Sequence, residues 1–289
     1  MPHVALPRIG TVAAWRREAR RLAEAGLPAE AVTWGLGDAG PDLLADLPPE
    51  RPAERPSDPA PPPASARPIR LPREAVEGIE TALLHSDPQR FARGYGVLVR
   101  LASGGLRWGD RGDPAMKRLL DQAQAARREI HRMHAFVRFT EIASAGPRRA
   151  FAAWYEPAHP VEEAALLFFA RRFGDMDWAI ATPRITARCT EGALALAETT
   201  DTTRPPPDAT AALWLTYYAN IFNPARLAEK AMQSHMPKRY WQNLPEAELI
   251  PTLLKEAEGR VRAMHKAAPS TPPARAAAIA RQRRRPPEP

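Results

Sequence analysis

Residues 160–197 read PVEEAALLFFARRFGDMDWAIATPRITARCTEGALALA, and this stretch decides the expected fold. Pro160 suits the first turn of a helix, and apolar side chains recur at helical spacing as far as Phe173. Three short runs with the composition of strands follow that helix, at 177–182, 185–189 and 193–197. A helix next to several short strands predicts an α+β fold.

Strand signals also precede this helix. Residues 135–142 alternate with a period of two, and residues 150–155 can return as a hairpin partner across Gly146 and Pro147. With the three later runs, they predict a small antiparallel sheet of about five short strands. The helix at 160–173 is expected to be inserted between those strands.

Helices are expected on both sides of the sheet, which makes the fold mostly helical. Asp113 can cap one of them, because Pro114 follows it in the first turn. The helices before the sheet are predicted at 73–85, 88–101 and 114–130. The C-terminal helical segment is predicted at 208–222, 224–235 and 246–266, with a turn at 237–241.

Composition divides the chain into four parts. Residues 48–72 hold ten prolines and almost no large apolar side chain, so they are expected to form an extended, solvated linker. The other expected parts are a small helix/strand unit at 1–47, a main α+β domain at 73–266 and a disordered basic tail at 267–289. A unit as small as the first is expected to dock on the main domain, because it cannot bury a core alone.

The small N-terminal unit has its own local signals. Thr11 can cap a helix that ends at Gly26, and residues 31–34 then have the composition of a short strand. The first ten residues lack a basic region followed by a long apolar run, and no apolar run in the 289 residues could span a bilayer. A cytoplasmic protein without a membrane partner is therefore expected.

Cys189 is the single cysteine in the sequence, and it is expected to be a small buried residue of a strand. One cysteine excludes an internal disulfide and an iron–sulfur cluster held by several thiolates of this chain. His131 and His134 lie three residues apart, but a zinc site needs further ligands. No metal and no cofactor are predicted.

The net charge of +8 favours a polyanion as partner. The residues after Lys266 contribute five arginines and one glutamate, 5 − 1 = +4, which is half of the total. The remaining cationic signal is concentrated in the stretch 216–251, where aromatic, basic and amide side chains alternate. Such residues can stack on bases and neutralise phosphates, although the same types also serve as ordinary core and surface.

Candidate nucleic-acid-binding residues come from three places in the sequence. The C-terminal stretch supplies Tyr218, Asn223, Arg226, Lys230, Lys238, Arg239 and Tyr240. Arg171 and Arg172 end the helix at 160–173, where cations also offset the helix dipole. His131, Arg132 and Arg138 could line an edge that binds phosphate.

Acid–base chemistry has one candidate cluster, formed by Glu156, His159, Glu162 and Glu163. No serine or threonine adjoins it in the sequence, and carboxylates are favourable in the first turn of a helix for structural reasons. No catalytic residue is therefore assigned.

Six segments carry a family resemblance that covers roughly residues 5–263. They are VTWGLGDAGPDLL (32–44), REIHRMHAFVRF (128–139), AAWYEPAHPVEEAALLFFARRFGDMDW (152–178), AIATP (179–183), YYANIFNPARL (217–227) and KAMQSHMPKRYWQNLPEAELIP (230–251). With these segments the chain resembles a bacterial family of unknown function that is usually labelled "probable DNA metabolism protein". The chain departs from it at His134, where arginine is more common, and at residues 189–192, where members often carry a Trp-Asp-Gly turn.

The resemblance implies a functional setting as well as a family. Members are often encoded beside a radical SAM protein with a DNA-related label, and some are fused to a uracil-DNA glycosylase-superfamily domain. It therefore implies a nucleic-acid-associated accessory protein in DNA repair or modification, with DNA and a radical SAM iron–sulfur protein as partners. Two alternatives stay open: a DNA-processing enzyme that acts on a damaged base or backbone in its own right, and a structural adaptor without nucleic-acid contact.

Overall fold

The computed structural model describes residues 2–37, 69–144, 147–200, 215–216, 218–220, 223 and 229–266. The chain divides into two compact units, a first unit at Met1–Asp208 and a second unit at Ala209–Pro289. The expected tail at 267–289, most of the expected linker and most of the predicted helix at 208–222 lie outside the described residues. Among the helices that are described, none is both long and apolar enough to cross a bilayer.

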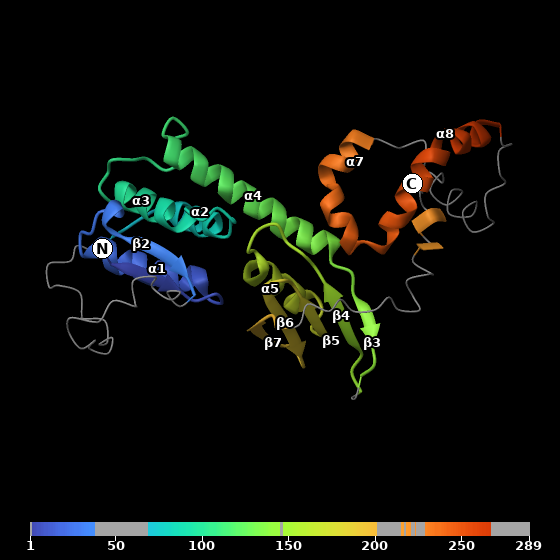
Figure 1. Cartoon of the computed structure of the whole chain (residues 1–289), viewed down its shortest axis with the longest axis horizontal. Helices are drawn as coiled ribbons and strands as arrows, with labels where there is room; N and C mark the ends of the chain where they lie inside the picture. The colour runs from blue at the N-terminus through green and yellow to red at the C-terminus, as the bar shows by residue number, and fades with distance from the viewer. Residues whose placement is uncertain are drawn as a thin grey trace, which may run out of the picture. The chain divides into compact units, whose positions relative to one another are not determined.

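The first unit opens with a β–α–β arrangement (Figure 1). Strands β1 (His3–Leu6) and β2 (Thr33–Leu36) pair in parallel, and α1 (Thr11–Glu24) and the 3₁₀ helix η1 (Ala29–Ala31) connect them. Parallel neighbours require such a crossover. The helix and β2 were predicted, whereas β1 was not, because a four-residue strand beside the N-terminus has too short a pattern to detect.

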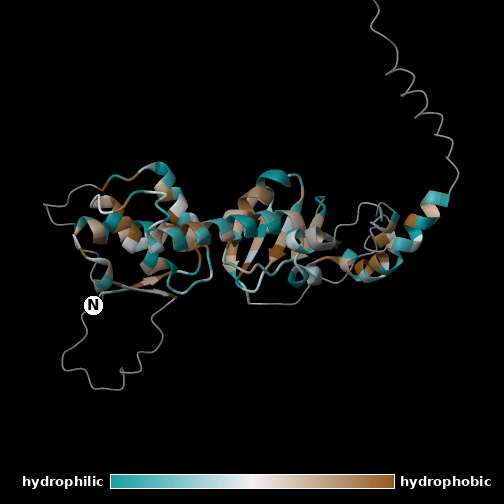
Figure 2. Ribbon diagram, turned by 90° about the horizontal axis from the view of Figure 1, so that it is seen from above, coloured by the Kyte–Doolittle hydropathy of each residue, from teal (hydrophilic) through white to brown (hydrophobic). Residues whose placement is uncertain are grey.

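Three helices complete the N-terminal half of this unit: α2 (Arg73–Leu83), α3 (Arg90–Ala102) and α4 (Pro114–Phe136). The side chain of Asp113 accepts a hydrogen bond from the backbone N of Met116, 2.9 Å away, so it caps α4 as expected. Trp15 of α1, Ile79 of α2 and Tyr95 of α3 share one buried apolar core with β1 and α4. The N-terminal unit therefore docks on the helices that follow it, and Figure 2 shows hydrophilic and hydrophobic residues mixed along these helices.

The five-stranded sheet has the order β3-β4-β5-β6-β7. Its strands are β3 (Thr140–Ile142), β4 (Ala150–Trp154), β5 (Asp177–Ala181), β6 (Ile185–Thr190) and β7 (Ala193–Glu198). Helix α5 (Glu162–Arg172) connects β4 to β5 and is the helix expected between the strands. The α+β class is confirmed.

Two details of the expected sheet were wrong. The sheet is mixed rather than antiparallel, because β4 and β5 run parallel on either side of the α5 crossover. The strand predicted at 135–142 is also too long. Residues 135 and 136 continue α4, and pairing begins only at Thr140. Over only a few residues, the same apolar spacing fits the period of a helix and the period of a strand. The boundary between α4 and β3 was therefore misplaced.

Strands β6 and β7 form a hairpin with a two-residue turn at Glu191 and Gly192, whose φ angles are 53° and 81°. Positive φ at both positions is typical of a type I′ turn, which favours Asn-Gly and Asp-Gly. The Asp-Gly pair that the resemblance places here therefore has a structural explanation in the turn itself. Cys189, just before the turn, is buried as expected.

The described part of the second unit is helical, with α7 (Glu229–His235), the 3₁₀ helices η3 (Lys238–Asn243) and η4 (Pro245–Leu249), and α8 (Ile250–Lys266). Tyr240, Leu244, Ile250 and Leu253 are buried. The buried positions of α8 end at Ala257, so the remainder of that helix is largely exposed to solvent.

Candidate functional site

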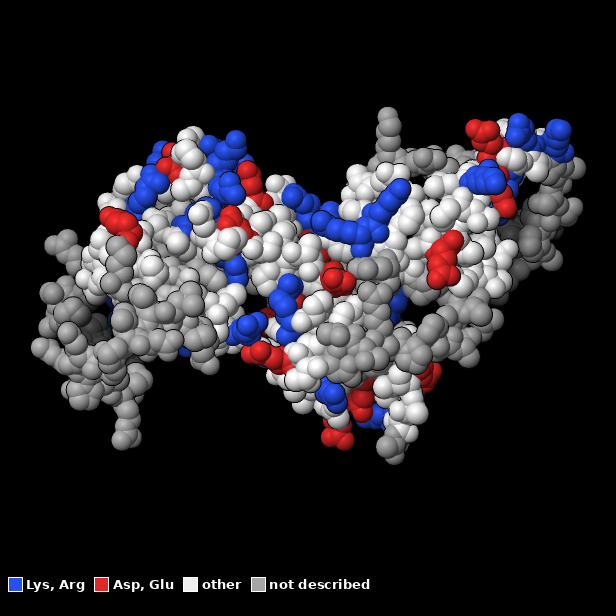
Figure 3. Space-filling view, in the orientation of Figure 1, with Lys and Arg blue, Asp and Glu red and all other residues white. Residues whose placement is uncertain are grey.

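An exposed apolar and cationic surface lies on α5 and the adjoining end of α4. Leu167 and Phe168 are 52% and 42% exposed although both are large and apolar. Together with Ala164, Arg171 and Arg172 they line a shallow hollow on α5. We call this region, with His131 and His134 of α4, the α4–α5 surface. Figure 3 shows lysine and arginine side chains gathered over the C-terminal half of α4, where Arg127 and Arg128 are exposed.

The ring of Phe168 is held in place from one side. It stacks on the His134 ring, with centroids 4.3 Å apart and planes at 25°. His134 is fixed in turn, because its Nε2 lies 3.0 Å from the carbonyl oxygen of Ala165 and must donate to it. Burial lowers the pKa of His134, which favours the neutral ring. His134 therefore covers one face of the Phe168 ring. The solvent-exposed area of the side chain lies away from that face.

Arg171 and Arg172 end α5 beside that ring. Both are exposed, and neither forms an ion pair with a residue that the structure describes. The Arg172 guanidinium lies 5.4 Å from the Phe173 ring centroid. Two cations without carboxylate partners beside an exposed aromatic ring can bind a polyanion that also carries planar groups.

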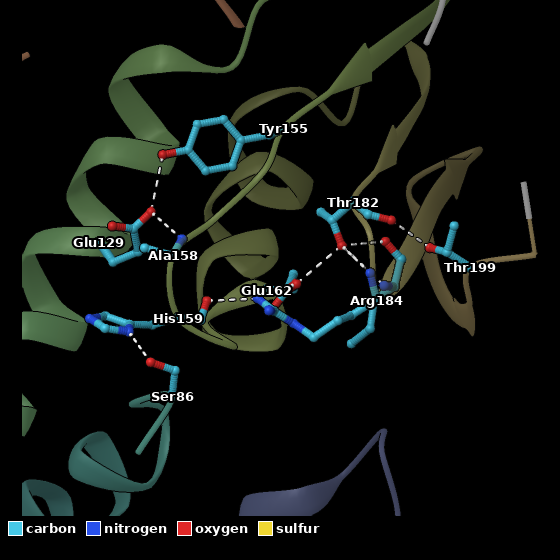
Figure 4. Close-up of polar contacts among 10 residues, drawn as sticks. Ser86, Glu129, Tyr155, Ala158, His159, Glu162, Thr182, Arg184 and Thr199 are labelled. Atoms are coloured by element: carbon cyan, nitrogen blue, oxygen red, sulfur yellow. Dashed lines mark hydrogen bonds and ion pairs between the residues drawn. The ribbon is translucent and has the colours of Figure 1, made fainter. Parts of the chain in front are cut away.

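A second polar region lies inside the same unit, where two buried glutamates face the loops of the sheet (Figure 4). Glu129 of α4 accepts hydrogen bonds from the backbone N of Ala158, 3.1 Å away, and from the Tyr155 hydroxyl at 3.3 Å. Arg132 lies 3.6 Å from its other oxygen. Glu129 therefore holds the segment after β4 against α4, and Arg132 compensates its charge.

Glu162 begins α5 and points at the turn between β5 and β6. Its Oε1 accepts from Arg184 at 2.8 Å and from the Thr182 hydroxyl at 3.1 Å. Burial raises the pKa of Glu162, and Arg184 opposes that shift. Thr182 also accepts from the backbone N of Ile185 at 3.0 Å, so one hydroxyl connects the turn to the buried carboxylate. This network fixes the turn rather than presenting groups to a substrate.

The predicted acid–base cluster does not converge on one point. Glu162 is engaged with Arg184, whereas both oxygens of Glu163 accept from the backbone N of Gly10, at 2.9 and 3.0 Å. His159 lies 3.1 Å from the Ser86 hydroxyl through its Nδ1. Glu156 is exposed on the loop before them. Glu162, Glu163 and His159 therefore each serve a different contact.

One histidine pair does come together near that cluster. The rings of His85 and His159 are in contact, with centroids 4.1 Å apart and planes tilted by 33°. His85 Nδ1 accepts from the backbone N of Asp87 at 3.0 Å, and burial lowers the pKa of His85. Within the described ranges, no three His, Cys, Asp or Glu side chains gather as a metal site would require.

A family profile with the description "Domain of unknown function (DUF4130)" matches residues 88–246. This is 246 − 88 + 1 = 159 of 289 residues, more than half of the chain. The chain belongs to the DUF4130 family. No curated protein and no solved structure matches it.

The DUF4130 region contains both polar features described above. It begins just before α3 and includes α3, α4, α5 and the whole five-stranded sheet. It therefore contains the α4–α5 surface and both buried glutamates. The small β1–α1–β2 unit and α2 lie outside it. The membership confirms that this is a domain of unknown function and gives no activity.

The candidate residues of the first unit fall into two groups. Arg171 and Arg172 lie on the α4–α5 surface, and His131 is exposed on α4 one turn from His134. Arg132 and Arg138 point elsewhere. Arg132 neutralises Glu129, and Arg138 donates to the backbone oxygen of Ala135 at 2.8 Å. The structure therefore does not bring His131, Arg132 and Arg138 together as one edge for phosphate.

The candidate residues of the second unit are described in part. Lys238, Arg239 and Asn223 are exposed. Tyr240 is buried, and its hydroxyl accepts from Arg239 at 2.8 Å, so its ring is a core residue and not a stacking surface. Tyr218 is half-buried. Arg226 and the side chain of Lys230 lie outside the described residues.

Reasoning from the sequence missed Arg90, Glu129, Thr182 and Arg184. A signal existed for Glu129, which lies between Ala126 and Met133 on the apolar stripe of α4. A charged residue on a buried stripe indicates a partner from elsewhere in the fold. For Thr182 and Arg184 the partner is on α5, and their spacing in the sequence carries no such signal.

Proposed function

We propose that this protein binds nucleic acid through the α4–α5 surface, as an accessory protein in DNA repair or modification. The observation that carries the proposal is Phe168, a 42% exposed aromatic ring supported from beneath by His134 and flanked by two arginines without ion pairs in the described chain. A supported ring with an open face is suited to stack a base, and base–aromatic stacking contributes about 1–3 kcal/mol per base.

The charges favour the same kind of ligand. Arg171 and Arg172 lie next to the ring in sequence and space, as required for contact with the phosphates on either side of a stacked base. Arg127 and Arg128 extend the cationic region along α4. Because stacking and phosphate contact ignore base identity, we expect affinity for single strands with little dependence on sequence.

The finer part of the proposal comes from the resemblance described at the outset. It implies DNA rather than RNA, and a radical SAM iron–sulfur protein as partner. The single cysteine supports this division of roles, because a cluster held by several thiolates needs more ligands than this chain has. The partner would do the chemistry, and this chain would hold the strand.

We expect Phe168→Leu to weaken binding to a labelled single-stranded oligonucleotide about five- to tenfold at constant salt, because leucine keeps the apolar bulk but has no ring to stack. Phe168→Trp should bind at least as tightly as the wild type. Fluorescence anisotropy measures both. Ile142→Ala is the matched control, since Ile142 is a 40% exposed apolar residue of β3 outside this surface.

The titration is run with the full chain and with a chain ending at Lys266, because the residues beyond it carry half of the net charge. Equal affinities for wild type and Phe168→Leu in both chains would contradict the proposal. If instead binding is lost in the chain that ends at Lys266, the cationic residues after Lys266 account for it, and the adaptor interpretation is preferred.

A further inference from the structure

A small enclosed cavity lies in the first unit, away from the α4–α5 surface. Its volume is about 80 Å³, and its wall combines the β1–α1 loop, α3, the start of α5 and the β5–β6 turn. Five of the lining residues are charged: Arg8, Arg90, Glu162, Glu163 and Arg184. Burying a charged side chain is costly unless it is paired or hydrogen-bonded. The partners of these five residues therefore decide whether the cavity is electrostatically satisfied.

Arg90 is the unusual member of this set. It is only 8% exposed, and its Nη1 donates to the backbone oxygen of Asp87 at 3.0 Å. Its Nε is buried without a hydrogen-bond partner, and no carboxylate among the described residues forms an ion pair with it. The Phe91 ring covers one face of the guanidinium, with its centroid 4.1 Å away. A buried cation is thus left with one edge unsatisfied.

The two carboxylates of the cavity do not satisfy that edge. Glu162 is paired with Arg184, and Glu163 accepts the backbone N–H of Gly10 with both oxygens. The five charged residues sum to 3 − 2 = +1. Burial lowers the pKa of Arg90, with further repulsion from Arg184, yet an arginine stays protonated near neutral pH. Asp87 opposes the lowering, and Arg8 is itself paired with Glu198 at 3.8 Å, so among the described residues Arg90 is the cavity arginine without an ion pair.

The backbone at the start of α5 also favours an anion. Helix α5 has no side-chain cap at Val161, and its first turn lines the cavity through Glu162 and Glu163. The N–H groups of a first turn and the helix dipole both favour an anion. The neighbouring N-terminus of α1 already has such an anion inside the protein, because the Glu163 carboxylate accepts a hydrogen bond from the backbone N of Gly10.

We propose that this cavity, the Arg90 pocket, binds a single phosphate-sized oxyanion. The Nη2 group of Arg90 would donate to one of its oxygens, a charge-assisted hydrogen bond that arginine readily forms with phosphate. Arg184, 39% exposed, and the exposed Arg8 would flank it at the mouth of the pocket. The volume suits one tetrahedral anion and is far below the 300–1,000 Å³ or so of pockets that enclose larger ligands such as whole nucleotides.

The test is thermal unfolding of the full chain in increasing inorganic phosphate, with chloride adjusted to hold the ionic strength constant. We expect a saturable rise of Tm in the wild type, because a ligand that binds only the folded state stabilises it by mass action. In Arg90→Met the apparent affinity should fall about ten- to a hundredfold. Arg17→Met removes an exposed arginine of α1 and should leave the affinity unchanged.

A merely structural role for Arg90 predicts the opposite pattern. Arg90→Met would then lower Tm without phosphate and leave the phosphate response intact. If the pocket exists to bind an anion, Tm without phosphate should be unchanged or higher, because methionine removes a buried unsatisfied cation and keeps the contact with Phe91. Should this variant fail to fold, Arg8→Ala changes an exposed residue and should weaken phosphate severalfold.

A wild type without a saturable response to phosphate, or an equal response in Arg90→Met, would overturn the proposal. Competition identifies the source of the anion. Displacement by a 5′-phosphorylated oligonucleotide but not by its 5′-hydroxyl form indicates a strand terminus, and displacement by neither indicates the free ion. Because the readout is phosphate and not strand binding, this proposal can fail while the α4–α5 surface stands, and the reverse.

Discussion

Replacing Gly78 by alanine is expected to lower the free energy of unfolding by about 3 kcal/mol, at the upper end of what overpacking costs. Gly78 is buried in the middle of α2, and a Cβ at this position would overlap the Trp108 ring at Cζ2 and Cη2. Trp108 is half-buried and packs against the core of the first unit, so its ring has to shift and give up part of that packing to admit the Cβ.

Gly96 of α3 provides the matched control in the same core. A Cβ there would lie 3.6 Å from the Cβ of Ala29, an ordinary contact. Gly96→Ala should therefore stabilise the protein by about 0.5–1 kcal/mol, the usual helical preference for alanine over glycine. Denaturant unfolding followed by circular dichroism measures both changes. Equal stability of the two variants would show that Trp108 does not pack on Gly78 as described.

Arg184→Met is expected to cost about 2–3 kcal/mol near neutral pH, less than the 3–5 kcal/mol typical of a fully buried pair because solvent reaches Arg184. The substitution leaves the buried Glu162 carboxylate without its cation. The double variant Glu162→Gln/Arg184→Met removes the unpaired charge as well and should recover most of the loss.

The cost of Arg184→Met should also depend on pH, with a definite sign. Burial raises the pKa of Glu162 above its unfolded value, so stability from this group is present below that value and is lost as pH rises through the folded pKa. Arg184 opposes the shift, and its removal raises the folded pKa further. The cost should therefore grow as the pH rises above about 4.5, the ordinary pKa of a glutamate. A cost that is constant with pH, or larger in acid, would contradict the burial of an ionised Glu162.

Periodicity was sufficient to predict most of the secondary structure. The apolar spacing of α2, α3 and α5 and the short runs of β5, β6 and β7 all appear in the structure within a few residues of their expected ends, whereas α4 ends six residues later than expected. Strand direction could not be predicted in this way, because the parallel pairing of β4 with β5 depends on how α5 crosses the sheet. The first strand, β1, gains its stability from pairing with β2, about thirty residues away in sequence.

The sequence predicted the candidate site residues correctly only where the position of a residue in its helix determines whether its side chain is exposed. Arg171 and Arg172 end a helix and are exposed, as basic residues there usually are. Tyr240 was expected to be available for stacking and is instead buried, because a tyrosine near a turn fits a core as well as a surface. The contacts of Glu162 with Arg184, and the isolation of Arg90 among charged groups, arise from folding and have no signature in local sequence.

The most direct measurement of the proposed function is the salt dependence of single-strand binding by Arg171→Ala/Arg172→Ala. A control variant, Arg17→Ala/Arg107→Ala, removes two exposed arginines from outside the α4–α5 surface, so both carry the same net charge of 8 − 2 = +6. If Arg171 and Arg172 each contact a phosphate, the slope of log affinity against log salt should become shallower by about 1.4 in the first variant and stay unchanged in the control. Equal slopes for wild type and both variants would contradict nucleic-acid binding at this surface.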